Sequence, residues 1–394
     1  MSRSILLLTH RAYAEPGNGA ARSVQTMMDW LAAEGWSARA VTSGRIEQAQ
    51  KLTIGAHHDA LGLSRRAGEA RLVASGRVGA VDLSAVETLP DAAGPDAAGE
   101  AQLTRLALHA IAAHRPDVVL TYGQDPCLDS ALAAARAGGA QVVCTLRGWG
   151  YDDRARFAHV DRVLATSAYL AQRYHRSIGL HATALASPID HAAVLAPDPC
   201  PEFVTFINPA FHKGVIAFAS LAQRLGRERP DIPLLVVASG ASAAPLATLP
   251  ELARHPALLV CPPQDPRDLY AITRLLLVPS TTAEPFGRVA AEAMVNGIPP
   301  LVSDRGGLPE TVGAGGTVLP LPAWLADKPD RLPTDAEMAP WFDAVIRLWD
   351  DAEAYARASA AARQGAITLY DEAEQRRRYV DYFTDPGPHP PLFA

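Results

Sequence analysis

The sequence has little lysine, few cysteines and no long apolar run, and each shortage narrows what the protein can be. Only three of its 36 basic residues are lysines, namely Lys51, Lys213 and Lys328, and the formal net charge is −6. Nothing in the charge balance indicates a nucleic-acid surface, so we expect no nucleic-acid partner. Because arginine is so strongly preferred, a lysine inside a motif carries more weight here than in most chains.

The four cysteines lack the spacing of a metal site or a disulfide framework. Cys127, Cys144, Cys200 and Cys261 form no C-x-x-C pair, which predicts neither zinc nor disulfides and fits a reducing cytoplasm. No apolar stretch reaches the length of a membrane span, and the apolar run at 5–8 is too short for the core of a signal peptide. We therefore expect a cytoplasmic protein without a transmembrane segment.

The chain is long enough for more than one domain. Its 394 residues are 48% hydrophobic and 20% charged, which predicts two or three domains with sizeable cores. At residues 5–42 the order strand, glycine-containing loop, helix, strand predicts a βαβ unit. The expected fold class is therefore α/β, with parallel sheets.

The stretch at 279–312 is the most informative part of the chain and reads PSTTAEPFGRVAAEAMVNGIPPLVSDRGGLPETV. An apolar run at 275–278 predicts a buried strand that ends in a loop, and residues 288–296 form a predicted helix. A second short strand is predicted at 299–302. The helix therefore begins beside the end of the first strand.

A helix N-terminus in this position is a ready anion site, because its free N–H groups and its dipole favour negative charge. Gly287 lets the backbone approach a ligand closely. Glu284 and Glu292 lie eight residues apart, about two helical turns, and carboxylates accept hydrogen bonds from sugar hydroxyls. A ligand that places phosphate on the backbone N–H groups and hydroxyls on the carboxylates would be a nucleotide sugar, so the pattern suggests that ligand. From spacing alone, a surface helix with two solvated glutamates is an equal alternative.

The residues of this stretch carry more information than their spacing. The E-x7-E spacing, Phe286-Gly287, the run EAM-x-x-G-x-P and the following GG-x-x-E together resemble the retaining glycosyltransferases of family 4. Members of that family have the GT-B architecture, in which two Rossmann-like parallel-sheet domains face a central cleft. The resemblance implies this fold for the present chain.

The resemblance also implies where the domains divide. It is strong over 200–315 and absent over 45–100, a region whose fold the sequence leaves open. The implied domains are an N-terminal Rossmann-like acceptor domain at 1–188, a C-terminal Rossmann-like nucleotide-sugar donor domain at 189–366, and at 367–394 a C-terminal helix that returns to the first domain and ends in a loose tail.

A second anion site is predicted where a strand leads through Asn208-Pro209 to Lys213-Gly214 and a helix. Relatives carry Lys-Gly here with the lysine on the pyrophosphate of the donor, so the resemblance gives Lys213 that role; a surface lysine is the alternative. Relatives often carry Gly-Arg where this chain has Asn208-Pro209. One expected cation is therefore missing, and Arg288 is its proposed replacement.

Further donor contacts follow from the resemblance. Gly17 and Gly19 match a glycine-rich loop that in relatives faces the phosphates or the acceptor, although an ordinary turn would look the same. Cys261 and Pro262 match the loop that frames the nucleobase through backbone groups. The implied donor-binding residues are Gly17, Gly19, Asn208, Lys213, Cys261, Pro262, Glu284, Phe286, Gly287, Arg288 and Glu292.

Arg147 departs from the family pattern. Many relatives read T-x-H-G at this point, with the histidine in the active site, and this chain has Arg147 instead. A guanidinium could bind an acidic group on donor or acceptor, or it could pair structurally with Asp152 or Asp153. The implied catalytic residues are Glu284, Lys213 and Arg147.

The implied activity is retaining transfer of a sugar from a UDP- or GDP-type donor to an unidentified hydroxyl acceptor, which could be a saccharide, a lipid-linked saccharide or a small metabolite. No Asp-x-Asp triad lies at a strand end, so no metal and no cofactor are expected, and Lys213, Arg288 and backbone amides would offset the charge of the leaving group. Glu284 would bind sugar hydroxyls and Glu292 the ribose.

Two other functions stay open from the sequence. A sugar-nucleotide epimerase could use the same architecture, and a protein of two such lobes could bind a nucleotide sugar without turnover. On a predicted helix, Arg173, His175 and Arg176 could contact an anionic membrane surface, although a solvated helix face explains them as well.

Overall fold

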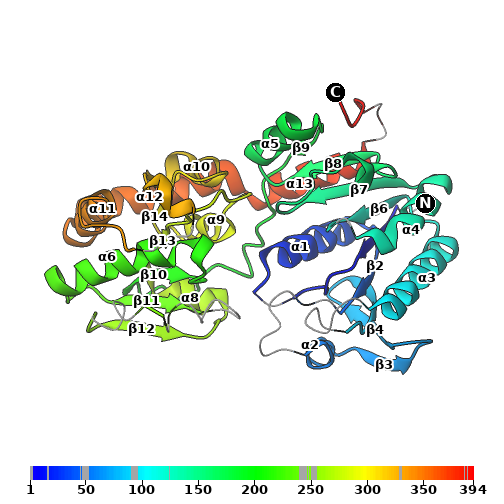
Figure 1. The fold of residues 1–394 in the computed structure, drawn as a ribbon, viewed down its shortest axis with the longest axis horizontal. Coiled ribbons are helices and arrows are strands. Elements are labelled where there is room, and N and C mark those ends of the chain that lie inside the picture. The colour runs from blue at the N-terminus through cyan, green and yellow to red at the C-terminus, as the bar shows by residue number, and fades with distance from the viewer. Residues whose placement is uncertain are drawn as a thin grey trace. The chain divides into compact units, whose positions relative to one another are not determined.

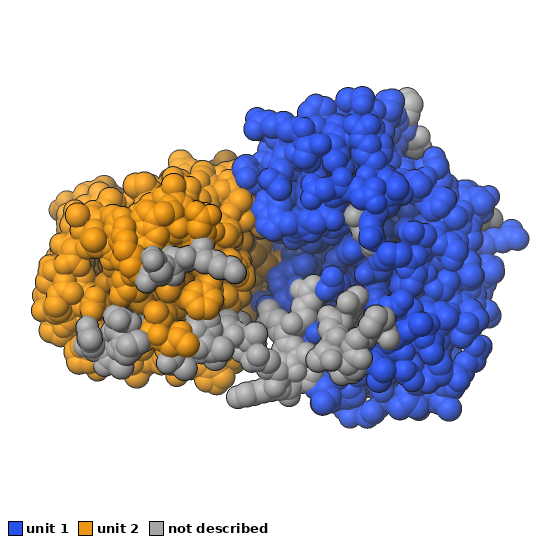
Figure 2. Space-filling model, in the orientation of Figure 1, with its two compact units in different colours: residues 1–188, 373–394 blue, residues 189–372 orange. Residues whose placement is uncertain are grey.

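The chain folds into two compact units. The computed structural model describes residues 3–15, 17–44, 46, 53–89, 96–123, 125–238, 246, 248–249, 255–327, 331–385, 387 and 389–394. Unit 1 consists of residues 1–188 together with 373–394, and unit 2 of residues 189–372 (Figure 2). The division after Pro188 lies where the sequence places the hinge, whereas unit 2 continues to Glu372 because a long helix, α12, runs on to Tyr370.

Unit 1 is built on a nine-stranded sheet in the order β3-β4-β5-β2-β1-β6-β7-β8-β9. The β3–β4 and β4–β5 pairs are antiparallel, and the other pairs are parallel. The elements of unit 1 are β1 (Ser4–Thr9), α1 (Gly19–Ala33), β2 (Ser37–Ser43), α2 (Ile54–Ala60), β3 (Ser64–Ala67), β4 (Leu72–Val78), β5 (Val81–Val86), α3 (Ala97–His114), β6 (Val118–Thr121), η2 (Pro126–Leu128), α4 (Asp129–Ala137), β7 (Gln141–Leu146), η3 (Arg154–Phe157), β8 (Arg162–Ala165), α5 (Ala168–Ile178), β9 (Thr183–Ala184) and α13 (Glu372–Thr384).

The central strands of unit 1 are buried on both faces. Their sequences, SILLLT in β1, VVLT in β6 and QVVCTL in β7, are the near-continuous apolar runs typical of such strands. Helix α13, red in Figure 1, returns to this sheet, and its Tyr379 belongs to the same buried cluster as Ile5 and Leu7. Nη1 of Arg162 in β8 donates to the carbonyl oxygen of Tyr382 at 2.6 Å, and this bond ties α13 to the sheet.

The region at 45–100, which the sequence leaves open, extends this sheet. In its described part, β4 and β5 form a hairpin through Gly79, whose φ is 57°, and β5 then pairs in parallel with β2. Ser75, Gly76 and Arg77 interrupt the apolar alternation of β4, which is why the pattern is weak.

Unit 2 is built on a six-stranded parallel sheet in the order β12-β11-β10-β13-β14-β15. Its elements are β10 (Phe203–Ile207), η4 (Phe211–Lys213), α6 (Val215–Glu228), β11 (Leu234–Val237), β12 (Leu258–Cys261), α8 (Pro266–Ile272), β13 (Thr273–Val278), α9 (Arg288–Val295), β14 (Pro300–Ser303), α10 (Leu308–Val312), η7 (Gly313–Gly315), β15 (Thr317–Leu319), η8 (Ala323–Ala326), α11 (Ala339–Asp350) and α12 (Ala352–Tyr370).

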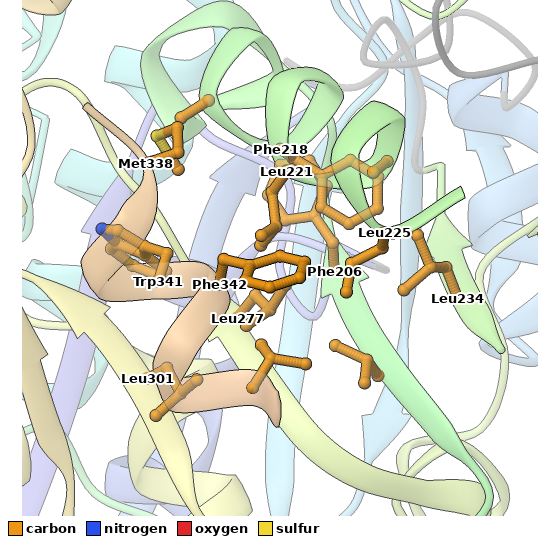
Figure 3. Close-up of a cluster of buried hydrophobic side chains, with 14 of the residues drawn as sticks. Phe206, Phe218, Leu221, Leu225, Leu234, Leu277, Leu301, Met338, Trp341 and Phe342 are labelled. Atoms are coloured by element: carbon orange, nitrogen blue, oxygen red, sulfur yellow. The ribbon is translucent and has the colours of Figure 1, made fainter. Parts of the chain in front are cut away.

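The core of unit 2 lies where α6 and α11 cover one face of this sheet. Figure 3 shows Phe206 of β10, Phe218 of α6 and Trp341 of α11 pointing into the same space. The rings of Phe206 and Phe218 stack with centroids 4.7 Å apart, and the indole nitrogen of Trp341 donates to the carbonyl oxygen of Pro320 at 3.0 Å. The polar atom of this large side chain is therefore satisfied inside the core.

Both sheets have a point at which the order of the strands reverses. In unit 2 it lies between β10 and β13, and in unit 1 between β1 and β6. Open parallel sheets bind their ligands beyond the carboxyl ends of the strands at such a point. The loops that follow β10 and β13 are therefore the first place to look for a site in unit 2.

The prediction of a loose tail is wrong for the last residues of the chain, 389–394. The amide nitrogen of His181 donates to the carbonyl oxygen of Leu392 at 2.7 Å, and the amide nitrogen of Ala394 donates to Gly179 at 3.0 Å. The ring of Phe393 packs edge to face on Phe157 with centroids 5.9 Å apart. An aromatic side chain in an apolar socket of unit 1 thus holds a segment that the sequence alone suggests is free.

Truncation of Phe218 should destabilise unit 2 specifically. Phe218→Ala removes a fully buried ring from the core, so we expect the free energy of unfolding to fall by about 3–5 kcal/mol. Hydrogen exchange followed on peptides of unit 2 measures the change. Ile367→Ala, at a side chain that is 63% exposed on α12, should change it by less than about 0.5 kcal/mol. Equal effects of the two changes would contradict this account of the core.

Candidate active site

An ion pair joins the two loops at the point of strand reversal in unit 2. Nζ of Lys213, in the loop after β10, lies 2.6 Å from Oε1 and 2.9 Å from Oε2 of Glu284, in the loop after β13. Ser280 Oγ also donates to Oε1 of Glu284 at 2.7 Å. The side chains of Lys213 and Glu284 are 29% and 11% exposed, so the pair faces solvent on the lysine side. A cation and a carboxylate are thus held together where a ligand is expected.

A single glycine allows these two loops to meet. Gly214 has a φ of 93°, and a Cβ atom there would lie 1.8 Å from the carbonyl oxygen of Pro279. The amide nitrogen of Thr281 donates to the carbonyl oxygen of His212 at 3.1 Å, which fastens the loops beside this contact. Burial and the charge of Lys213 lower the pKa of His212, so its imidazole is neutral at pH 7. The glycine of the Lys-Gly pair is therefore required by geometry.

The Gly-Gly turn of the motif holds the backbone of Glu284. Gly306 has a φ of 66°, and a Cβ atom there would lie 2.3 Å from the nitrogen of Glu284. The amide nitrogen of Gly307 donates to the carbonyl oxygen of Glu284 at 2.7 Å. A third glycine, Gly287, has a φ of 155° and leaves no room for a Cβ atom beside Leu308. These glycines fix the position from which the Glu284 carboxylate points.

A second polar cluster lies on α9. Nε of Arg288 donates to Oε1 of Glu292 at 2.6 Å, one helical turn away, and the hydroxyl of Tyr270 donates to Oε2 at 2.7 Å. Glu292 is 4% exposed, so this carboxylate is buried and bonded at both oxygens. The sequence does not single out Tyr270, because it stands in an apolar run beside β13. In the sequence, Tyr270 is marked only by its place five residues before the strand predicted at 275–278.

Asn208 explains the departure from the Gly-Arg pattern. Its φ is 63°, in the left-handed region, where asparagine is among the few non-glycine residues that are well tolerated. Its amide nitrogen donates to the carbonyl oxygen of Val237 at 2.9 Å, and its own carbonyl oxygen accepts from Ala210 at 2.8 Å. Asparagine therefore keeps the turn that a glycine would make at this position.

The remaining residues of the predicted donor set in unit 2 include Phe286, Cys261 and Pro262. Phe286 is buried, and its ring packs edge to face on Tyr370 with centroids 5.9 Å apart. The carbonyl oxygen of Pro262 accepts from Nε2 of Gln264 at 2.9 Å. Burial raises the pKa of the Cys261 thiol, so the sulfur stays protonated at neutral pH. Any contact of Phe286 with a donor would come from its peptide group.

The three predicted residues of unit 1 lie at the carboxyl ends of its strands. Gly17 has a φ of 74°, and Gly19 is the first residue of α1, whose N-terminus is capped by the side chain of Asn18. Nη1 of Arg147, directly after β7, lies 3.4 Å from Oγ of Ser187. One of the proposed structural partners of Arg147, Asp153, instead accepts from the amide of Ala155 and caps η3.

Two general properties of the described part of the chain concern its partners. Within it, no group of three or more His, Cys, Asp or Glu side chains is arranged to hold a metal ion. Its helices are all too short or too polar to span a membrane.

Comparison with known proteins places this geometry in a family. The family model for glycosyl transferases group 1 matches residues 191–364, and the model for glycosyltransferase family 4 matches residues 17–192. The chain belongs to glycosyltransferase family 4. The first match covers the loops that carry Lys213 and Glu284, and the second covers the glycine-rich loop and Arg147. The protein is therefore a glycosyltransferase, as the motif predicts.

Solved structures confirm the GT-B architecture of the glycosyltransferase. Anabaena HepE in complex with UDP and glucose has a TM-score of 0.69 at 15% identity, over 98% of this chain and 100% of that one. Sucrose-phosphate synthase from Thermosynechococcus elongatus has a TM-score of 0.69 at 17% identity, over 97% and 98%. A glycosyltransferase from Rickettsia africae has a TM-score of 0.67 at 14% identity, also over 97% and 98%. No curated protein matches the chain.

Substitution of Gly214 should separate the two loops of the active site. Gly214→Ala places a methyl group against the backbone at Pro279, which no side-chain movement can relieve, so the Thr281–His212 hydrogen bond should break. Hydrogen exchange of the Thr281 amide should then become faster, and the thermal midpoint should fall.

The matched control for this change is Gly139→Ala. Gly139 has a φ of 89°, close to that of Gly214, but a Cβ atom there meets nothing within 4 Å. We expect a cost of about 1–2 kcal/mol from the left-handed backbone alone. Exchange at Thr281 should be unchanged. If both variants exchange alike at Thr281, the contact with Pro279 does not hold the loops together.

Proposed function

We propose that unit 2 binds a UDP-sugar and that the enzyme transfers the sugar, with retention of its anomeric configuration, to a hydroxyl group of an acceptor. The observation that carries the proposal is the Lys213–Glu284 pair at the reversal point of the strands. Uridine is favoured over guanosine because HepE, which shares the fold, was solved with UDP and with UDP-glucose. The reaction is expected to take place in the cytoplasm.

Lys213 is proposed to bind the pyrophosphate. An ammonium group at the N-terminal end of α6 adds a full charge to the partial charge of the helix dipole, and both attract phosphate. In the structure this ammonium is bonded to Glu284. Binding of the donor therefore exchanges one anion for another at Lys213, and the Glu284 oxygens become acceptors for the sugar hydroxyls.

Glu292 is proposed to bind the ribose, and Arg288 the phosphates. Because a guanidinium carries five N–H donors, Arg288 can bond Glu292 through Nε and a phosphate oxygen as well. Tyr270 holds the other oxygen of the carboxylate, so the ribose would meet a carboxylate of fixed orientation. Arg288 is thereby proposed to replace the arginine that is absent at Asn208-Pro209.

Retention is proposed to follow from a reaction on one face of the sugar. The bond between the anomeric carbon and the β-phosphate oxygen breaks, and the acceptor oxygen bonds to the same face. The acceptor proton passes to the leaving phosphate, so no protein nucleophile is required. Lys213, Arg288 and the backbone N–H groups stabilise the diphosphate that forms, in the place of a metal ion. Arg147 is proposed to bind an acidic group of donor or acceptor.

Loss of either member of the ion pair should abolish efficient transfer. Lys213→Ala removes a cation that stabilises the leaving diphosphate, and Glu284→Ala removes the acceptor for the sugar hydroxyls, so kcat/KM should fall by about a hundredfold to a thousandfold in each. Release of UDP from UDP-glucose provides the assay, and NMR of the products should show the donor's anomeric configuration.

Arg227→Ala is the control. Arg227 also forms an ion pair in unit 2, with Asp335 at 2.6 Å, but both side chains are exposed on the surface. Its loss should leave kcat/KM within about twofold of the wild type. Unchanged transfer in both Lys213→Ala and Glu284→Ala would refute the proposal. Free epimerised UDP-sugar without transfer would indicate an epimerase instead.

Donor binding should not need a metal. A ligand that binds the native state raises the thermal midpoint, and we expect UDP-glucose to raise it equally in EDTA and in Mg²⁺. GDP-, ADP- and dTDP-glucose, measured side by side, should raise it less. A shift that appears only with Mg²⁺ or Mn²⁺ would contradict the roles given to Lys213 and Arg288.

A further inference from the structure

The loop after β7 in unit 1 holds an exposed tryptophan in a fixed place. Trp149 is 40% exposed. A Cβ atom added to either neighbouring glycine, Gly148 or Gly150, would meet no other atom within 4 Å, so the space around the loop is open. A single exposed apolar side chain is common on protein surfaces, so a function for Trp149 is indicated by how its ring and its loop are held and not by its exposure.

Buried groups under this loop fix it from both sides of the tryptophan. The hydroxyl of Tyr174, a fully buried residue of α5, donates to the carbonyl oxygen of Gly148 at 3.0 Å and accepts from the amide of Tyr151 at 3.3 Å. The hydroxyl of Tyr151 in turn accepts from the amide of Gly123 after β6 at 3.1 Å. One buried hydroxyl therefore binds the backbone one residue before and two residues after Trp149.

Two side chains of α5 hold the indole itself. The guanidinium of Arg173 lies 4.8 Å from the centroid of the Trp149 ring, and the ring of Tyr169 meets it at 89° with centroids 6.5 Å apart. Tyr169 and Arg173 are one helical turn apart, so the same face of α5 supplies both contacts. A cation over the ring and an edge-on tyrosine restrict an otherwise mobile side chain.

The position of this loop points to a ligand of the enzyme. The loop begins at the carboxyl end of a parallel strand, the edge at which open sheets bind their ligands. Arg147, two residues before Trp149, lies on the same loop. A flat apolar ring beside hydrogen-bond donors suits a sugar, whose ring has an apolar C–H face and a rim of hydroxyls.

A membrane surface fits these observations less well. Insertion into a bilayer needs several apolar side chains on one face. Among the described residues of unit 1, the exposed large apolar side chains are Leu72, Leu89 and Trp149, which lie on three separate elements. The apolar side of α5 is already buried through Leu170 and Tyr174, and its exposed side is polar.

We infer that Trp149 is the stacking platform for the acceptor and that the acceptor is a saccharide. This inference rests on the proposed function, because it names the acceptor of that reaction. The sugar ring packs on the indole, and Tyr169 and Arg173 hold the platform in place. Trp149 is a specificity-determining residue that contacts the acceptor and takes no part in donor binding.

Binding of the full-length enzyme to an array of immobilised mono- to tetrasaccharides, in the presence of UDP, tests the inference. Wild type should bind a subset of the saccharides. Trp149→Ala should bind that subset about tenfold more weakly, whereas Trp149→Phe, which keeps an aromatic face, should retain most of the affinity. Leu72→Ala is the control, because it removes a similarly exposed apolar side chain on β4 and should bind like the wild type.

Three outcomes would overturn the inference: equal binding by Trp149→Ala and the wild type, no binding of the wild type to any saccharide, or a Trp149-dependent binding to phosphatidylglycerol vesicles with none to saccharides. The thermal shift caused by UDP-glucose, measured on the same preparations, separates this inference from the proposed function. If the wild type shows no shift, the proposed function fails. If all variants show the shift but saccharide binding does not depend on Trp149, only the inference fails.

Discussion

The candidate site of unit 2 depends on the contact between two loops at the ends of its central strands. The loop after β10 meets the loop after β13 only because Gly214 has no side chain to strike the backbone of Pro279. That approach brings Lys213 within 2.6 Å of Glu284, although 71 residues separate them in the sequence. The charge at the site is therefore balanced before any ligand binds, and a ligand must compete with a carboxylate for the lysine.

Much of the fold and part of the site follow from local sequence. The motif at 279–312 can be recognised because its glycines stand where the backbone leaves no room for a side chain. Gly306 and Gly307 both lie within contact distance of the Glu284 backbone. The bond between Arg288 and Glu292 is likewise available from helical spacing. Asn208 departs from the Gly-Arg pattern and adopts a left-handed conformation, which asparagine tolerates better than most non-glycine residues.

Other features depend on tertiary contacts that no local pattern records. Tyr270 donates to Glu292 from a different helix, and the residues around Tyr270 in the sequence do not indicate that its hydroxyl has a buried polar partner. Phe393 packs on Phe157, and this contact holds the C-terminal residues on unit 1, although the sequence suggests a loose tail. At 45–100 the alternation of apolar and polar residues in β4 is weak, so the sequence does not predict the β4–β5 hairpin that extends the sheet. The partners of Trp149 come from α5, so its fixed position could not be anticipated from the loop alone.

The return of α13 to the first sheet affects the order in which the two units can fold. Because residues 373–394 belong to unit 1, the 189–372 segment is an insertion within it, and the first sheet lacks part of its cover until residues 373–394 have been synthesised. The second unit has all of its residues available earlier. Until Tyr379 is synthesised, the buried cluster around Ile5 and Leu7 therefore lacks one of its aromatic side chains.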